Sequence, residues 1–126
     1  MKKNSKYYWG IGIVIMVAII SLLVYVSRLP GKYDGFARCI KDSGAKFYGA
    51  FWCSHCQTQK RAFGKSAKYL PYVECSTPDG QGQLSECSEA GVQSYPTWQY
   101  PDGTRESGEI TFERLAEKTS CVLPKD

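Results

Sequence analysis

Two cysteines, Cys53 and Cys56, carry the strongest chemical signal in this sequence of 126 residues. They are separated by two residues and follow an aromatic-rich run from Phe47 to Trp52. A buried strand followed directly by a helix would place both sulfurs on the first turn of that helix, on one face. They would then be close enough to form and open a disulfide. The pattern predicts thiol–disulfide exchange.

The start of a helix is a favourable place for a reactive thiol. Unpaired N–H groups and a partial positive charge there favour a thiolate at Cys53 over a thiol. His55 lies inside the motif and, when protonated, adds a second positive charge beside the same sulfur. We therefore expect Cys53 to be the nucleophile, Cys56 the resolving thiol and His55 the residue that tunes the pair.

A Cys-x-x-Cys pair is also half of many zinc sites, which need a second close pair of ligands. The only histidine, His55, lies between the two cysteines of the motif. The other four cysteines are far apart in the sequence: Cys39, Cys75, Cys87 and Cys121. No complete ligand set remains. We expect redox chemistry at the motif, with no metal and no cofactor.

The remaining cysteines predict two structural disulfides, because six cysteines in so short a chain favour an oxidising compartment. Cys75 and Cys87 flank a loop over 76–83 that has little apolar content to hold it, so we expect them to pair. A Cys39–Cys121 bond would tie the first helix of the domain to the end of the last one. The alternatives, that Cys39 and Cys121 are unpaired or that one passes electrons to a partner, stay open.

Composition and charge narrow the function classes. The chain is 43% hydrophobic and 22% charged, as globular proteins are. Three of its 16 basic residues, Lys2, Lys3 and Lys6, precede a long apolar segment, which leaves 13 basic against 12 acidic residues elsewhere. This balance gives no electrostatic footprint for nucleic acid, so we expect no nucleic-acid partner.

The apolar segment over 9–26 contains no charged residue. As a helix it would be roughly 27 Å long, enough to cross the hydrocarbon core of a bilayer. A cleaved signal peptide has the same general pattern, but this run is longer than a usual signal core, and the sequence from Val24 to Arg28 is a poor cleavage site. We expect an uncleaved transmembrane anchor over 9–27, preceded by a tail over 1–8.

The lysines that precede the apolar segment also set its expected orientation. They outnumber Arg28 and Lys32, which follow it, so the positive-inside rule places the N-terminus in the cytoplasm. The cysteine content favours the same arrangement. We therefore expect a single-pass protein of the cell membrane, with a linker over 28–33 and an extracytoplasmic domain over 34–126.

The positions of apolar and turn-forming residues predict a mixed order of helices and strands in this domain. We expect helices over 34–43 with Asp34 as its cap, 53–70 with a kink at Gly64, 84–90 and 111–119, and strands over 47–52, 71–75, 92–100 and 104–107. The corresponding fold class is α/β, with a central sheet of about four strands flanked by helices.

This order of elements resembles a thioredoxin fold. Trp52-Cys-Ser-His-Cys56 is similar to the active site of that family, and Tyr95-Pro96-Thr97 is similar to its cis-proline loop. The resemblance implies a cis bond before the proline, which only about 5–6% of X-Pro bonds adopt. It also implies a substrate groove, with Trp52, Ser54, Tyr95, Pro96 and Thr97 as the candidate residues.

Residues 47–57, 72–76 and 86–98 are similar to the thioredoxin-like domain that is fused to bacterial and plant homologues of vitamin K epoxide reductase. The resemblance implies two kinds of partner: exported proteins with thiols, and a membrane quinone reductase of the vitamin K epoxide reductase type, here a separate protein. The sequence departs from the family pattern at Ser54, where Cys-Pro-His-Cys has proline. It departs from reducing thioredoxins at Phe47, where they carry a buried aspartate.

Phe47 and His55 favour an oxidase, so the leading hypothesis is an anchored thiol–disulfide oxidoreductase that donates disulfides to exported proteins. One alternative is an anchored reductase of the cytochrome c maturation type, although such proteins usually carry a longer insertion between the motif and the cis-proline. The other is a redox-inert interaction domain, against which the intact cysteine pair argues. A reduction potential near about −120 mV supports the oxidase and one near about −270 mV the reductase.

Overall fold

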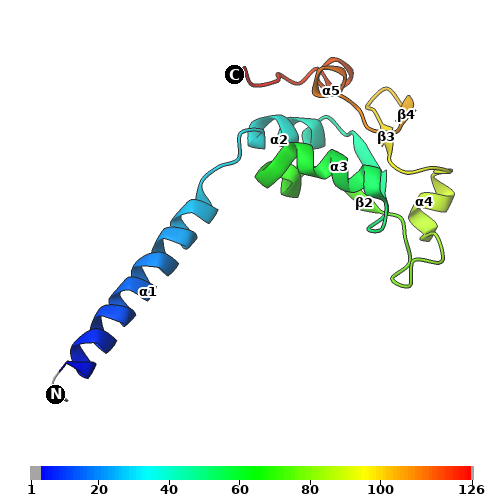
Figure 1. Cartoon of the computed structure of the whole chain (residues 1–126). Coiled ribbons are helices and arrows are strands. Elements are labelled where there is room, and N and C mark those ends of the chain that lie inside the picture. Colours follow the sequence, from blue (N-terminus) through cyan, green and yellow to red (C-terminus); the bar gives the residue numbers. More distant parts are fainter. Residues whose placement is uncertain (1–3, 126) are drawn as a thin grey trace. The chain divides into compact units, whose positions relative to one another are not determined.

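The computed structural model describes residues 4–125, and the chain divides after Pro30 into two units. The first unit contains one helix, α1 (Ser5–Arg28) (Figure 1). The large apolar side chains of this helix are exposed. By length and composition this helix is a candidate membrane span. It begins four residues earlier than the predicted anchor. Lys2 and Lys3, which carry part of the orientation argument, lie outside the described residues.

The second unit is built on a mixed four-stranded sheet with the order β2-β1-β3-β4. Its strands are β1 (Lys46–Gly49), β2 (Tyr72–Glu74), β3 (Thr97–Gln99) and β4 (Arg105–Ser107). Strand β2 is parallel to β1, whereas β3 is antiparallel to both of its neighbours. The sheet is flanked by α2 (Asp34–Asp42), α3 (Ser54–Phe63), the 3-10 helix η1 (Gly64–Tyr69), α4 (Ser85–Glu89) and α5 (Phe112–Thr119). The predicted α/β class and the thioredoxin-like fold are confirmed.

Strand β1 lies inside the sheet, between β2 and β3, and both of its faces are buried. Successive side chains of a strand point to opposite faces. Phe47 lies in the main core, where its ring stacks on Trp98 with a centroid distance of 4.5 Å. Tyr48 lies in a second cluster with Cys75 and Cys87. A strand covered on both faces needs a nearly continuous apolar sequence, which is the pattern that made this segment recognisable.

Three predicted elements are clearly shorter than expected. The strand predicted over 47–52 ends at Gly49. The helix predicted over 53–70 ends at Phe63, because Gly64 adopts a φ of 55° and the chain continues as the 3-10 helix η1. Of the strand predicted over 92–100, only Thr97–Gln99 joins the sheet. The residue before it, Pro96, has no N–H to donate to a strand neighbour.

The predicted cap of the first domain helix is wrong. Tyr33 occupies the N-cap position of α2 and makes no side-chain capping bond. Asp34 is the first helical residue, and its carboxylate accepts a hydrogen bond from the Ser66 hydroxyl at 2.7 Å. That bond lowers the pKa of Asp34 and ties α2 to η1. Asp34 therefore makes a hydrogen bond to another helix instead of capping its own, and the local sequence does not reveal this contact.

Candidate redox site

Cys53 and Cys56 are joined by a disulfide at the start of α3, with their Cα atoms 5.2 Å apart. Cys53 is the N-cap residue, and its sulfur accepts a hydrogen bond from the Cys56 N–H at 3.1 Å. Cys53 is 6% exposed, whereas Cys56 is fully buried. Both cysteines are buried, and Cys53 is the slightly more exposed of the two.

The turn that precedes α3 is held by hydrogen bonds to its own backbone. The Cys53 N–H donates to the Ala50 carbonyl at 3.0 Å. This bond closes a turn between the end of β1 and the start of α3. The Gln57 side-chain amide reaches back to the Phe51 carbonyl at 3.0 Å. These bonds fix the position of Cys53 before any partner binds.

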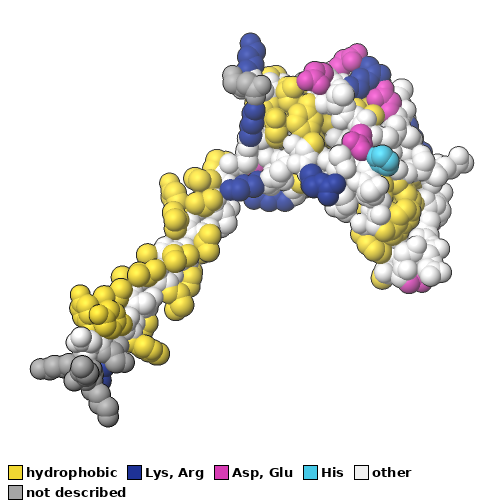
Figure 2. Space-filling model, in the orientation of Figure 1, with side chains coloured by type: hydrophobic (Ala, Val, Ile, Leu, Met, Phe, Trp, Pro, Cys, Tyr) yellow, Lys and Arg dark blue, Asp and Glu magenta, His cyan; other side chains and the backbone are white. Residues whose placement is uncertain are grey.

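Two aromatic residues beside the cysteine pair are exposed: Phe51 at 49% and Trp52 at 55%. The Trp52 indole N–H donates to the Ser76 hydroxyl at 2.8 Å, and its ring meets the Tyr95 ring edge-on at 6.0 Å. Trp52 is thus oriented on both sides while its surface remains available. Figure 2 shows exposed hydrophobic side chains close to the histidine of this region.

The predicted groove residues are not equally available. Tyr95 and Pro96 are joined by a cis peptide bond, as the resemblance implied. Ser54 is exposed on the first turn of α3. Thr97 is only 5% exposed, and its hydroxyl donates to the Ser94 carbonyl at 2.7 Å. The structure therefore brings Trp52 and Tyr95 together and uses Thr97 to hold the loop.

His55 has a partner that the sequence did not indicate. Its Nδ1 atom lies 2.7 Å from a carboxylate oxygen of Glu109, with 71% and 41% of the two side chains exposed. A pair this open to solvent contributes about 1 kcal/mol or less. Glu109 offsets part of the positive charge that His55 brings to the site when protonated. The two residues are 54 positions apart, so no local pattern could have paired them.

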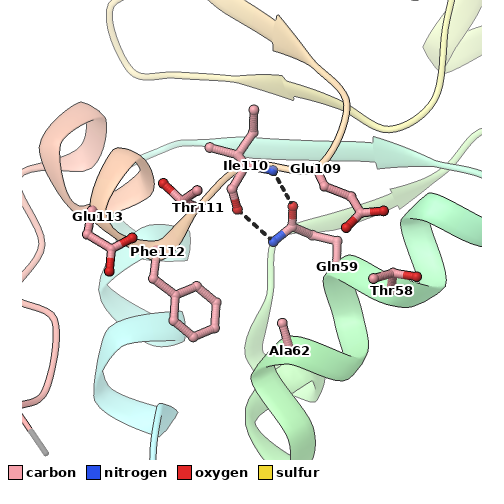
Figure 3. Close-up of a pocket in the computed structure, with 8 residues that line it drawn as sticks. All are labelled: Thr58, Gln59, Ala62, Glu109, Ile110, Thr111, Phe112 and Glu113. Carbon is pink, nitrogen blue, oxygen red and sulfur yellow. Dashed lines mark hydrogen bonds between the residues drawn. The ribbon is translucent and has the colours of Figure 1, made fainter.

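Glu109 is held near α3 by a buried glutamine. Gln59, which is 3% exposed, accepts a hydrogen bond from the Ile110 N–H at 2.7 Å and donates one to the Ile110 carbonyl at 3.1 Å (Figure 3). The side chain thereby pairs with the backbone as a neighbouring strand would. A surface pocket of about 340 Å³ lies beside it, lined by Thr58, Gln59, Ala62 and residues 109–113. The Gln59–Ile110 pair positions the acid that faces His55.

The other four cysteines form two disulfides within the domain. Cys75 and Cys87, both fully buried, have Cα atoms 5.5 Å apart. Cys39 on α2 is bonded to Cys121, which follows α5, with a Cα separation of 5.8 Å. Cys53–Cys56 is the one pair that begins a helix beside exposed aromatic residues. Within residues 4–125, no group of three or more His, Cys, Asp or Glu side chains is arranged to hold a metal ion.

A polar cluster around β2 was not predicted from the sequence. One carboxylate oxygen of Glu74 accepts from the backbone N–H groups of Phe51 and Ser76, and the other accepts from the Tyr72 hydroxyl at 2.8 Å. The ammonium of Lys60 lies 3.2 Å from the centre of the Tyr72 ring. Burial, followed by the bond to Glu74, raises the pKa of Tyr72. Burial lowers the pKa of Lys60.

The fold and this site define a thioredoxin-like domain with a Cys-x-x-Cys disulfide at a helix start. No family model matches the chain. Over 92 residues, 69% of the chain, it is 48% identical to a protein of Arabidopsis thaliana, "Thiol-disulfide oxidoreductase LTO1". The aligned region is 24% of that protein, so the chain spans about a quarter of the length of this curated relative. The chain is thus a homologue of a thiol–disulfide oxidoreductase.

Proposed function

We propose that this chain is a membrane-anchored thiol–disulfide oxidoreductase that donates disulfides to exported proteins. One observation carries the proposal: Cys53 and Cys56 are bonded to each other at the start of α3, where Cys53 at the N-cap keeps 6% exposure and Cys56 keeps none. Thiol–disulfide exchange requires one accessible sulfur and one held beside it. The similarity to a thiol–disulfide oxidoreductase supports the same class of reaction.

The reaction follows from the positions of the two sulfurs. A substrate thiolate attacks Cys53, the Cys53–Cys56 bond breaks, and Cys56 leaves with the electron pair. A second substrate thiolate then attacks the substrate sulfur of the mixed disulfide, and Cys53 leaves as a thiolate. The substrate dithiol loses two electrons and the site gains them. The Cys56 N–H, 3.1 Å from the Cys53 sulfur, stabilises the departing thiolate.

The residues around the Cys53–Cys56 pair support transfer of the disulfide from this protein to the substrate. The position six residues before Cys53 is occupied by Phe47, which is fully buried and stacked on Trp98, so it supplies no ionisable group. The exposed rings of Phe51 and Trp52 suit the apolar side chains of unfolded substrates. Both features fit a disulfide donor.

A donor must be reoxidised after each cycle. We assign this step to a membrane quinone reductase of the vitamin K epoxide reductase type, with α1 holding the domain at the same membrane. The domain would lie on the extracytoplasmic side. Protease added to sealed cells should then digest the domain, and complete protection would contradict this orientation.

The redox activity is tested with the full chain in detergent micelles. We expect the Cys53–Cys56 pair to equilibrate with glutathione at a potential closer to about −120 mV than to about −270 mV. Cys56→Ser should accumulate mixed disulfides with substrates, because the resolving sulfur is missing, whereas Cys53→Ser should accumulate none. Absence of exchange would contradict the activity, and a potential near that of thioredoxin would contradict the donor direction.

A further inference from the structure

The charged residues of the domain are segregated along the chain, although their total is nearly balanced. Residues 31–70 contain eight Lys and Arg residues and two Asp residues, whereas residues 71–126 contain four Lys and Arg residues and ten Asp and Glu residues. Figure 2 shows acidic side chains gathered on the side of the domain that carries α5. Surface charges that serve solubility alone are usually interspersed. The separation therefore points to a partner with one sign of charge.

Three exposed cations lie on or beside the 3-10 helix η1. The guanidinium of Arg38, from α2, lies 3.8 Å from the centre of the Tyr69 ring, and the ammonium of Lys68 lies 5.0 Å from the same centre. Lys65 is three positions before Lys68, and side chains at this spacing lie on one face of a 3-10 helix. These cations are thus close together, although α2 and η1 are distant in the sequence.

The chain enters the domain beside the same helix. The Tyr33 N–H donates to the Ser66 hydroxyl at 3.1 Å, and a Cβ atom at Gly31 would lie 3.1 Å from the Ser66 nitrogen. Gly31 is three residues after Arg28, the last residue of α1. Three residues of chain span at most about 11 Å, so η1 stays near the end of α1 in any orientation of the domain. We call the exposed cations of this region the basic face: Lys32, Arg38, Lys65 and Lys68.

Aromatic rings accompany these cations, as they do in proteins at a membrane interface. Tyr69 is half-buried under Arg38 and Lys68, and the ammonium of Lys32 lies 5.4 Å from the centre of the half-buried Tyr33 ring. A half-buried acid, Asp34, lies among them. Its carboxylate accepts from the Ser66 hydroxyl, so it also fixes η1 against α2.

We propose that the basic face binds the anionic lipid headgroups of the bilayer that α1 crosses. Cations near an anionic surface are attracted within about one Debye length, roughly 8 Å at physiological salt. The linker holds η1 near that surface, and the acidic side chains of residues 71–126 are repelled from it. Attraction and repulsion together select one orientation of the domain. This inference rests on the proposed membrane anchor.

Docking through the basic face leaves the redox pair uncovered. Cys53 is the N-cap of α3, whereas η1 follows the other end of that helix. The ten residues of α3 span about 15 Å, which separates the cysteine pair from the cations of η1. A docked domain would therefore keep the pair open to exported proteins while the membrane sets its orientation.

Nuclear magnetic resonance of the full chain in lipid nanodiscs tests the docking. Discs of phosphatidylcholine are compared with discs of equal parts phosphatidylcholine and phosphatidylglycerol. Amide chemical shifts show which residues meet the anionic lipid, and nitrogen relaxation shows whether the domain tumbles with the disc or moves on its linker. The test variant combines Lys65→Gln with Lys68→Gln. The matched control combines Arg105→Gln with Lys125→Gln, which removes the same number of exposed charges from the acidic part of the chain.

In anionic discs we expect shift changes at η1 and Arg38, none at α5, and tumbling of the domain with the disc. In phosphatidylcholine discs the domain should move on its linker. Each cation strengthens attraction to an anionic surface about fivefold, so the test variant should lower the ratio of docked to undocked domain about 30-fold. Salt at about 1 M, where the Debye length is about 3 Å, should also release the domain.

The control variant should dock as the unaltered chain does. Equal tumbling in both kinds of disc, shift changes centred on α5, or an equal loss of docking in the control would overturn the proposal. A chain that alkaline carbonate extracts from vesicles would instead overturn the membrane anchor on which the proposal rests.

Discussion

Gly49→Ala should destabilise the domain, although alanine has a higher intrinsic preference for ordered backbone than glycine. The new Cβ would lie 2.7 Å from a ring carbon of Tyr72, about 1 Å inside the usual carbon–carbon separation. It would also lie 3.1 Å from the buried Cys56 sulfur. Overpacking of this kind lowers the free energy of unfolding by about 1–3 kcal/mol.

The clash is not easily relieved by a movement of the ring. Tyr72 packs edge-on against Phe47 at a centroid distance of 5.3 Å, and its hydroxyl is bonded to Glu74. Displacing the ring would disturb both contacts. In a Tyr72→Ala background the penalty of Gly49→Ala should be smaller, because the clash with the ring is gone and only the contact with the Cys56 sulfur remains. A double-mutant cycle would measure this coupling directly.

Gly35→Ala provides a control of opposite sign. Gly35 lies in α2, and a Cβ there would meet no atom within 4 Å. The substitution should raise the free energy of unfolding by about 0.4–1 kcal/mol, because alanine reduces the freedom of the unfolded chain. Urea unfolding of the oxidised full chain in detergent micelles, followed by tryptophan fluorescence, gives both values. A Gly49→Ala variant as stable as the unaltered chain would refute the packing argument.

Three further perturbations test other parts of the domain. Replacing Cys39 and Cys121 together by alanine opens a crosslink between positions 82 residues apart, so the free energy of unfolding should fall by about 4.5 kcal/mol in urea titrations. His55→Gln removes a stabilising positive charge from the thiolate, so the potential measured against glutathione should fall. Hydrogen bonds from Thr104 and Lys118 lower the pKa of Asp102 from 3.8 to about 2. Stability from Asp102 is therefore complete above about pH 4 and lost towards pH 2, and Asp102→Asn should flatten this dependence in acid unfolding curves.

The fold could be predicted from sequence because its signals are local. The apolar run at β1 followed by Cys-x-x-Cys indicated a strand and a helix start, and the helices predicted over 84–90 and 111–119 agree with α4 and α5 to within one residue at each end. Boundaries depended on tertiary context instead. Nothing in the sequence around Gly64 distinguished a kinked α-helix from a helix followed by a 3-10 turn.

The motif residues of the site could be predicted for the same reason, and their partners could not. The cysteine pair and His55 lie within four consecutive residues, whereas the acids that surround them come from other elements. Glu109 reaches His55 from the segment before α5, and Glu74 lies at the end of β2. Surface acids are common, and only the parallel pairing of β1 with β2 places Glu74 beside the active-site turn.

The end of β2 connects the buried Cys75–Cys87 disulfide to the turn that carries the Cys53–Cys56 pair. Glu74 accepts from the Phe51 N–H, the Cys75 N–H donates to the Gly49 carbonyl, and Ser76 accepts from Trp52. Three consecutive residues thus hold the turn that carries Cys53. The middle one is bonded to Cys87 and fully buried, so this support is closed to exchange partners. The buried disulfide therefore keeps the turn in place while the Cys53–Cys56 pair opens and closes beside it.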